Sequence, residues 1–146
     1  MMMIYSMADG IAESLDKIPD ELFAQHVMGD GVAIRTEEEW LYSPIDGEVT
    51  MIFETKHALG LKGEDGTELL VHIGVDTVNM QGEPFAVYID VGEKVKTGDL
   101  LMHVDFKKIE KAGYCPDIML IATNKKIRVL KEQGEIKKGE PLLEVL

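Results

Sequence analysis

The chain has 146 residues, and its 27 Asp and Glu residues outnumber its 15 Lys and Arg residues, which gives a formal net charge of −12. This acidity disfavours binding to nucleic acids and to anionic lipid surfaces, whereas a basic protein partner is compatible with it. The single cysteine excludes an intramolecular disulfide, and no apolar stretch is long enough to span a membrane. We therefore expect a cytoplasmic protein that is stabilised by one hydrophobic core.

At the N-terminus, residues 1–7 contain neither a cationic segment nor a long apolar core, so they do not indicate a secretory signal. We expect residues 1–7 to be disordered and residues 8–146 to form a single domain. The segment PDELFAQHV, residues 19–27, predicts one or two helical turns that begin at Pro19.

Along the rest of the chain, short apolar runs rich in Val, Ile and Leu alternate with turns that contain glycine. This spacing is typical of an all-β protein, and we expect an antiparallel β-sandwich or barrel with one or two short helices. A further helix is predicted at residues 106–112, FKKIEKA, where Asp105 can cap the start and Gly113 can end it. The glycine turns lie at residues 46–47, 63–66, 81–83, 91–99 and 132–140.

An internal repeat supports the all-β prediction. KVKTGDLLMHV, residues 94–104, aligns with EIKKGEPLLEV, residues 135–145, so that Gly98 and Gly139 occupy the same position in the two copies. Two copies of a strand, turn and strand indicate a duplicated motif within one sandwich and not a solenoid. Biotinyl and lipoyl carrier domains share the K-x-G-D-x-L pattern, but the Met-Lys-Met segment that typically holds their exposed lysine is absent.

TELLVHIGVDTV, residues 67–78, places a histidine, His72, within a strand that is otherwise apolar. If GEDG, residues 63–66, is a four-residue hairpin loop, His57 of the preceding strand pairs with His72 and the two imidazoles meet on one face. A three-residue turn would instead set His57 opposite Ile73 and separate the rings. In the four-residue register, Leu59, Leu61, Leu70 and Gly74 share the face of the histidines, while Leu69, Val71, Ile73 and Val75 point to the core.

Gly74 lacks a side chain, which leaves room for another group beside the His72 ring. Its backbone carbonyl could also accept the Nδ1 proton of His72, so that Nε2 keeps the lone pair. A neutral imidazole in this tautomer can attack phosphorus without a separate base. His57 would then donate a hydrogen bond to the phosphoryl oxygens, and Thr55 would be a further hydroxyl donor or would orient His57.

Two other roles for the histidines stay open on this reasoning. A lone histidine in a strand is usually structural and satisfied by a backbone partner, although two cationic rings that meet would cost energy. A metal is the second alternative, because His57 and His72 could both bind zinc. Zinc prefers four ligands, and no third ligand stands nearby at a suitable spacing.

The segment GTELLVHIGVDTV, residues 66–78, resembles the phosphorylation-site signature of the IIA components of the glucose class of the bacterial phosphoenolpyruvate-dependent sugar phosphotransferase system. Three more segments match that family in order and spacing, namely residues 18–34, 43–61 and 92–113. The resemblance covers about residues 8–146 of the chain. It implies an antiparallel β-sandwich of the duplicated hybrid motif type.

The resemblance also implies a function for the histidine pair. His72 matches the phosphohistidine of the family, which accepts a phosphoryl group on Nε2 from the phosphocarrier protein HPr. That residue passes the group to a cysteine in the IIB domain of a membrane sugar permease. His57 matches the second active-site histidine, and Thr55 matches the threonine two residues before it. Such a relay needs no cofactor, and the protein docks to its permease at the inner face of the membrane.

A docking surface for both partners follows from the same resemblance. Asp20 and Asp76 match acids that family members present to basic residues of their partners. His26 and His103 match no functional position, so we expect them at the surface. An apolar rim surrounds the histidines, and it is matched here by Leu22, Phe23, Val27, Met28, Phe53, Leu70 and Val78.

Two rival functions share the histidine pair. The first is a regulatory binding module with the same fold, in which a zinc ion is shared by His57, His72 and a carboxylate of the partner. The second is a zinc metallopeptidase of related architecture. Its usual H-x-H pair is absent here, because Ile73 and Gly74 follow His72.

Overall fold

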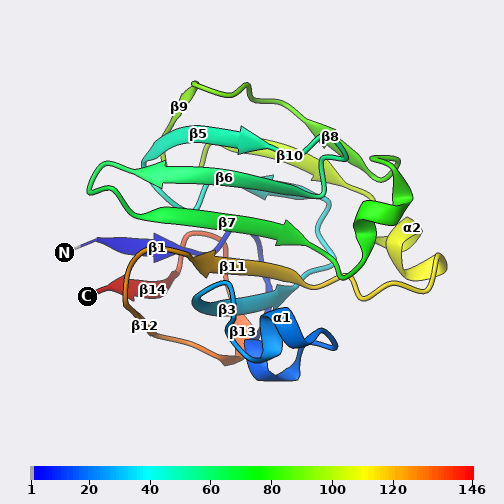
Figure 1. Ribbon diagram of the computed structural model, residues 1–146, viewed down its shortest axis with the longest axis horizontal. Coiled ribbons are helices and arrows are strands. Elements are labelled where there is room, and N and C mark those ends of the chain that lie inside the picture. Colours follow the sequence, from blue (N-terminus) through cyan, green and yellow to red (C-terminus); the bar gives the residue numbers. More distant parts are fainter. Residues whose placement is uncertain (1) are drawn as a thin grey trace.

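The regular secondary structure of the computed structural model, which describes residues 2–146, consists mainly of antiparallel sheets (Figure 1). The largest sheet contains, in strand order, β13 (Gln133–Ile136), β2 (Gly10–Ser14), β3 (Asp30–Arg35), β11 (Ile118–Ala122), β7 (Glu68–Ile73), β6 (Ala58–Gly63), β5 (Gly47–Ile52) and β9 (Lys94–Val95). One small sheet contains β1 (Met3–Tyr5), β14 (Pro141–Val145) and β12 (Ile127–Val129). The other contains β4 (Trp40–Tyr42), β10 (Leu100–Val104) and β8 (Phe85–Val87). The predicted all-β architecture is confirmed.

One main hydrophobic core joins the large sheet to the two small ones. Along β7, Leu69, Val71 and Ile73 are buried in this core, as the period of two predicts. Each small sheet adds its own apolar residues, such as Ile4 from β1 and Leu101 from β10. Strands from both ends of the sequence thus share a single core.

Short helices occupy both places where the sequence predicts helical turns. α1 (Glu21–Ala24) follows the cap residue Asp20, whose carboxylate accepts a backbone N–H of the first turn at 2.9 Å. α2 (Phe106–Lys111) follows Asp105, whose carboxylate accepts a backbone N–H in the same way at 3.1 Å. Within residues 2–146, no helix is long and apolar enough to cross a bilayer.

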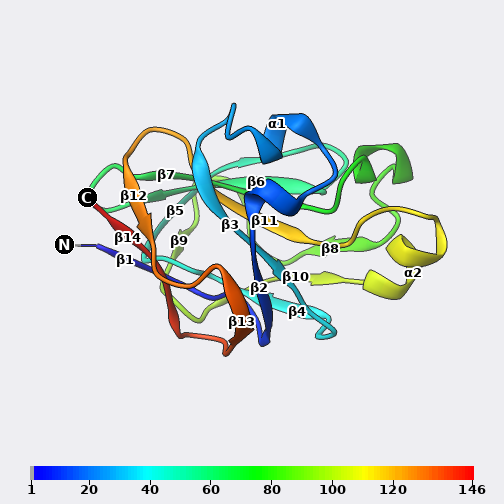
Figure 2. The same cartoon turned by 90° about the horizontal axis from the view of Figure 1, so that it is seen from below.

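Two turns of 3-10 helix complete the secondary structure. η1 (Leu15–Lys17) precedes α1, and the two together cover the outer face of the large sheet (Figure 2). η2 (Thr77–Met80) follows β7. The apolar cluster under η1 and α1 lies beside His72, because β11 pairs with β7. This cluster contains Leu15, Ile18, Phe23, Ala33, Val75, Met119 and Ile121.

The internal repeat appears as two equivalent strand-turn-strand units, each of which crosses from the large sheet to one of the small sheets. β9 and β10 flank a turn at Gly98, and β13 and β14 flank a turn at Gly139. The N–H of Gly98 donates to the carbonyl of Ser43 at 2.9 Å, and the N–H of Gly139 donates to the carbonyl of Ser6 at 3.0 Å. The structure therefore confirms the duplication that the sequence predicts.

Residues 2–7 are ordered, which corrects the prediction of disorder for this part of residues 1–7. β1 pairs with β14, and both Ile4 and Met7 are completely buried. The reason is the duplication, because β1 occupies in one copy the place that β4 occupies in the other. A signal for this was present, since YSMADG at residues 5–10 matches YSPIDG at residues 42–47. Residue 1 lies outside the described residues.

The hairpin between β6 and β7 has a different register from the predicted one. Ala58, and not His57, pairs with His72. The loop has three residues, 64–66, and Gly66 has a left-handed backbone with φ of +89°, which three-residue hairpin loops commonly require. The predicted four-residue loop is therefore wrong. Two residues expected beside His72 lie in the core instead, namely Leu59 and Leu61.

Ile4→Ala tests whether the N-terminal strand contributes to stability. Because Ile4 is completely buried, we expect the substitution to lower the free energy of unfolding by about 2–5 kcal/mol. Urea denaturation measures this difference. Leu130→Ala, at an exposed position, is the control and should change the free energy by less than about 0.5 kcal/mol. Equal stability of Ile4→Ala and the unmodified protein would contradict the packing of β1.

Candidate functional site

The two histidines meet even though the predicted register is wrong. The ring centroids of His57 and His72 are 4.9 Å apart, and the ring planes make an angle of 79°. His57 precedes the first residue of β6, and Lys56 before it has a left-handed backbone with φ of +59°. This turn interrupts the regular alternation of side chains. The His57 ring can therefore lie beside His72, while its carbonyl accepts the N–H of Ile73 at 2.7 Å.

Hydrogen bonds define the tautomer of His72 and orient His57. The Nδ1–H of His72 donates to the carbonyl of Gly74 at 2.9 Å, as predicted. A carbonyl can only accept, so Nε2 of the neutral His72 ring keeps its lone pair. On the other ring, Nδ1 of His57 lies 2.5 Å from Oγ1 of Thr55. When the Thr55 hydroxyl donates to Nδ1, His57 carries its proton on Nε2 and can donate it there.

Gly74 is needed for the turn after β7 and not for access to the ring. Its backbone is left-handed, with φ of +78°. A Cβ at this position would lie 2.3 Å from Cγ2 of Thr77 and 3.0 Å from the carbonyl oxygen of Cys115. The predicted acceptor role of its carbonyl is confirmed, but the space that its missing side chain leaves is filled by Thr77.

Desolvation lowers the pKa of both imidazoles and so favours their neutral forms. Burial lowers the pKa of His72 to about 4, and the neighbouring His57 acts in the same direction. Asp20 and Asp76 oppose this shift only in part. Phe23, which is 3% exposed, covers the His72 ring with its centroid 4.9 Å away. Burial also lowers the pKa of His57.

The other predicted site residues surround the histidines in different ways. Asp20 is partly buried at the start of α1, whereas Asp76 is exposed and has a left-handed backbone with φ of +63°. Phe23, expected on the apolar rim, is buried against His72 instead. Phe53 is half-buried, with its ring centroid 5.2 Å from that of His57. Of the remaining rim residues, Leu22, Val27 and Val78 are exposed, and Met28 and Leu70 are half-buried.

Some residues that shape the site were not predicted. Met119 lies opposite His72 on the neighbouring strand β11. The buried carboxylate of Asp117 pairs with Nε of Arg35 at 2.6 Å, and the Asp117 carbonyl accepts the N–H of Gly74 at 2.8 Å. No local pattern signals this ion pair, because 82 positions separate its two residues in the sequence.

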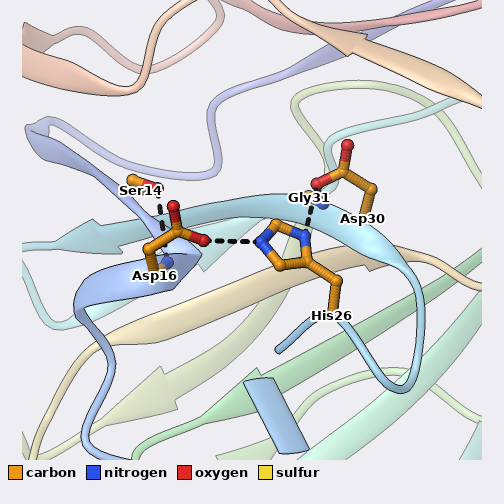
Figure 3. A network of polar contacts seen from close by, with 5 residues as sticks. All are labelled: Ser14, Asp16, His26, Asp30 and Gly31. Carbon is orange, nitrogen blue, oxygen red and sulfur yellow. Dashed lines mark hydrogen bonds and ion pairs between the residues drawn. The ribbon is translucent and has the colours of Figure 1, made fainter. Parts of the chain in front are cut away.

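A polar network ties down the segment that carries α1 (Figure 3). Nε2 of His26 lies 2.7 Å from Oδ1 of Asp16, and Nδ1 lies 2.8 Å from Oδ1 of Asp30. The two carboxylates raise the pKa of His26, most strongly through the hydrogen bond to Asp16. His26 is exposed, as expected. The network joins η1, the end of α1 and the start of β3, so it holds Phe23 over His72.

Metal ligands are scarce around the histidines. In the part of the chain that the structure describes, residues 2–146, no three or more His, Cys, Asp and Glu side chains are grouped so as to hold a metal ion. The histidine pair supplies two nitrogen atoms. A zinc ion bound there would need its other ligands from a second molecule.

Known proteins resemble this chain in sequence and in fold. A sequence model of the family described as phosphoenolpyruvate-dependent sugar phosphotransferase system, EIIA 1, matches residues 2–128. The glucose permease IIA of Mycoplasma capricolum has a similar structure, with a TM-score of 0.87 and 32% sequence identity. That likeness covers 97% of this chain and 94% of the other.

Curated relatives are similar in sequence over most of the chain. The glucose-specific EIIA component of Bacillus cereus is 41% identical over 115 residues, which is 79% of this chain and 70% of that protein. The glucose-specific EIICBA component of Streptococcus pneumoniae is 45% identical over 121 residues, which is 83% of this chain and 17% of that protein. The beta-glucoside-specific EIIBCA component of Bacillus subtilis is 41% identical over 96% of this chain and 24% of its own length. This chain thus spans only a small part of the last two relatives.

The burial of His72 predicts its titration. We expect NMR to give a pKa of about 4 for this ring. Because that value lies below the ordinary 6.5, the unfolded chain binds the proton more readily between these two pH values. The stability that neutral His72 contributes is therefore present above pH 6.5 and is lost as the pH falls toward 4. His72→Gln should lack this part of the acid destabilisation. A measured pKa of about 6 or more would contradict the burial of the ring.

Proposed function

Because this chain belongs to the EIIA 1 family of the phosphoenolpyruvate-dependent sugar phosphotransferase system, we propose that His72 carries the phosphoryl group in this relay. The group arrives from the phosphocarrier protein HPr and leaves for the IIB domain of a sugar permease. The names EIICBA and EIIBCA support the second partner, since they place an EIIA part in one protein with EIIB and EIIC parts. Docking to the permease brings the protein to the inner face of the membrane.

The hydrogen bond between Nδ1 of His72 and the Gly74 carbonyl is the observation that carries this proposal. It leaves Nε2 with a lone pair, and the low pKa keeps the ring neutral at pH 7. A neutral imidazole in a single tautomer is a nucleophile that needs no separate base.

In the receiving step, the Nε2 lone pair of His72 forms a bond to phosphorus. The bond between phosphorus and the donor breaks, and the donor keeps that electron pair. The ring gains positive charge as Nε2 binds, and the Gly74 carbonyl stabilises this charge through Nδ1–H. In the forwarding step, a nucleophile of the IIB domain binds phosphorus and Nε2 recovers its lone pair. Nδ1 keeps its proton throughout. The donor, His72 and the acceptor supply every bond that forms or breaks, so the proposed relay needs no cofactor.

His57 is placed to stabilise the group in transit. Its ring is close to His72, and its Nδ1 is held by Thr55. With the Thr55 hydroxyl as donor, the Nε2–H of His57 can donate to a phosphoryl oxygen on His72. The charge that spreads over these oxygens during transfer makes such a hydrogen bond stronger than one in the resting protein.

The surroundings of His72 suit a protein partner that carries basic residues. Asp20 and Asp76 are near enough to the ring to influence its pKa. Exposed Leu22, Val27 and Val78 place apolar surface in the same segments. The net charge of −12 adds a long-range attraction for a basic partner, so we assign HPr and the IIB domain to this surface.

The two rival functions gain no support. A zinc site shared with a partner would take only His57 and His72 from residues 2–146, and none of the relatives named above is described as a zinc protein. The family model and the relatives named above all belong to the phosphotransferase system, and none is named as a peptidase.

Phosphoryl transfer to the purified protein tests the proposal. The chain is incubated with phosphoenolpyruvate, the first enzyme of the system and HPr, and the added phosphate is measured by intact-mass spectrometry. We expect one acid-labile phosphate on the unmodified protein and none on His72→Ala. His103→Gln is the control and should be labelled normally. Labelling of His72→Ala would show that another residue accepts the group.

His57→Gln separates the two steps of the relay. The nucleophile remains in this variant, so we expect it to accept phosphate from HPr. Onward transfer to a IIB domain should slow by about 100-fold, because the hydrogen bond to the phosphoryl oxygens is lost. Quenched-flow measurement of both half-reactions gives the two rates. Undiminished onward transfer would contradict the role of His57.

A further inference from the structure

The outward face of the small sheet formed by β4, β10 and β8 carries aromatic and aliphatic side chains, where a solvent-facing strand usually carries polar ones. Trp40 pairs with His103, and their ring centroids are 4.6 Å apart. The Tyr88 ring lies 5.9 Å from that of Trp40. Figure 2 shows this sheet on the side of the molecule away from α1. We call the surface the aromatic face, and it consists of Trp40, Tyr42, Ala86, Tyr88, Leu100 and His103.

The second copy of the repeat shows that the fold does not require this surface. In the sheet of β1, β14 and β12, Glu144 stands where β10 has His103, and it pairs with Arg128 at 3.2 Å. Met3 stands opposite Glu144, as Trp40 stands opposite His103. At the positions of Trp40 and His103 the second copy therefore carries Met3 and Glu144 in place of aromatic rings, whereas Tyr5 matches Tyr42.

The rings of the aromatic face are accessible. Trp40 is 41% exposed and Tyr88 is 56% exposed, and Leu100 beside them is also exposed. Exposed clusters of large apolar side chains are uncommon on soluble proteins unless another molecule covers them. Trp and Tyr are also the residues that most often dominate the binding energy of protein interfaces.

Along the chain, acidic residues flank the members of the aromatic face. Along the chain, no Lys or Arg lies within two residues of any of its members. The acids that do lie within two residues are Glu38, Glu39, Asp90, Asp99 and Asp105. Two cations also lie close to the face: Lys107 lines a pocket together with Trp40, Glu37, Glu39 and Glu110, and in the other copy of the repeat Nζ of Lys138 lies 4.1 Å from the centroid of the Tyr42 ring. This contact shows that the face accepts a cation on an aromatic ring.

We propose that the aromatic face binds a basic segment of a partner protein, which sets apolar side chains on Trp40 and Tyr88 and directs Lys or Arg side chains to the surrounding acids. Opposite charges at the border favour such a segment. A second copy of this chain would bring like charges together, since each copy has a net charge of −12. The aromatic face shares no residue with the His72 site. This protein can therefore bind one partner at the aromatic face and another at the His72 site at the same time.

Fluorescence of Trp40 tests the proposal directly, because it is the only tryptophan in the chain. The probe is a short synthetic peptide of alternating Arg and Leu, and the matched peptide contains Arg and Ser. We expect the Arg and Leu peptide to shift the emission of Trp40 and to bind about tenfold more tightly than the matched peptide. Tyr88→Ser, Leu100→Ser and Glu39→Gln should each weaken binding several-fold. Met51→Ser, at an exposed apolar position on β5, is the control and should bind normally.

Each contrary result overturns the proposal in a different way. Equal affinity for the two peptides, or normal binding by both Tyr88→Ser and Leu100→Ser, would show attraction by net charge alone. A dimer in light scattering that Tyr88→Ser abolishes would show that a second copy covers the face. Thermal unfolding and phosphate labelling of His72 verify that Tyr88→Ser and Leu100→Ser are folded. Labelling serves as this check because neither Tyr88 nor Leu100 is part of the phosphoryl-transfer site.

Discussion

The hydrogen bond from Nδ1 of His72 to the carbonyl of Gly74 is the interaction on which the site depends. It exists because Gly74 turns the chain in a left-handed conformation between Thr77 and Cys115, where no side chain fits. The N–H of the same glycine is bonded to the carbonyl of Asp117 on the neighbouring segment. The carbonyl that selects the His72 tautomer is therefore held by the backbone of this turn, and Nε2 keeps its lone pair.

Burial and charge act on His72 in opposite directions, and burial is the stronger effect. Phe23 and the sheet remove water from the ring, which lowers its pKa to about 4 even though Asp20 and Asp76 favour the protonated form. The acids can therefore attract a basic partner without protonating the nucleophile at neutral pH. This division of roles requires α1 to stay in place, and the contacts of His26 with Asp16 and Asp30 hold the adjoining segments together.

Duplication explains why a chain of this size has two chemically different surfaces on one framework. The turns at Gly98 and Gly139 make the same backbone contacts with Ser43 and Ser6. Because these contacts involve backbone atoms, the outward side chains can differ between the copies without loss of the fold. One small sheet accordingly carries an ion pair of Arg128 with Glu144, and the other carries the aromatic face.

The sequence by itself determined the class of the fold, the cap of α2 at Asp105, the repeat and the candidate histidines. These features are local, since alternation, glycine turns and cap residues act over a few positions of the chain. It also predicted the acceptor role of the Gly74 carbonyl, which lies two residues from His72. Only the tertiary structure decided the register of β6 and β7, the burial of Phe23 and Ile4, and the pairing of Arg35 with Asp117. A one-residue change of register leaves the local sequence pattern almost unchanged, so packing decides the register. Contacts between distant segments have no local signature in the sequence, so packing decides these contacts as well.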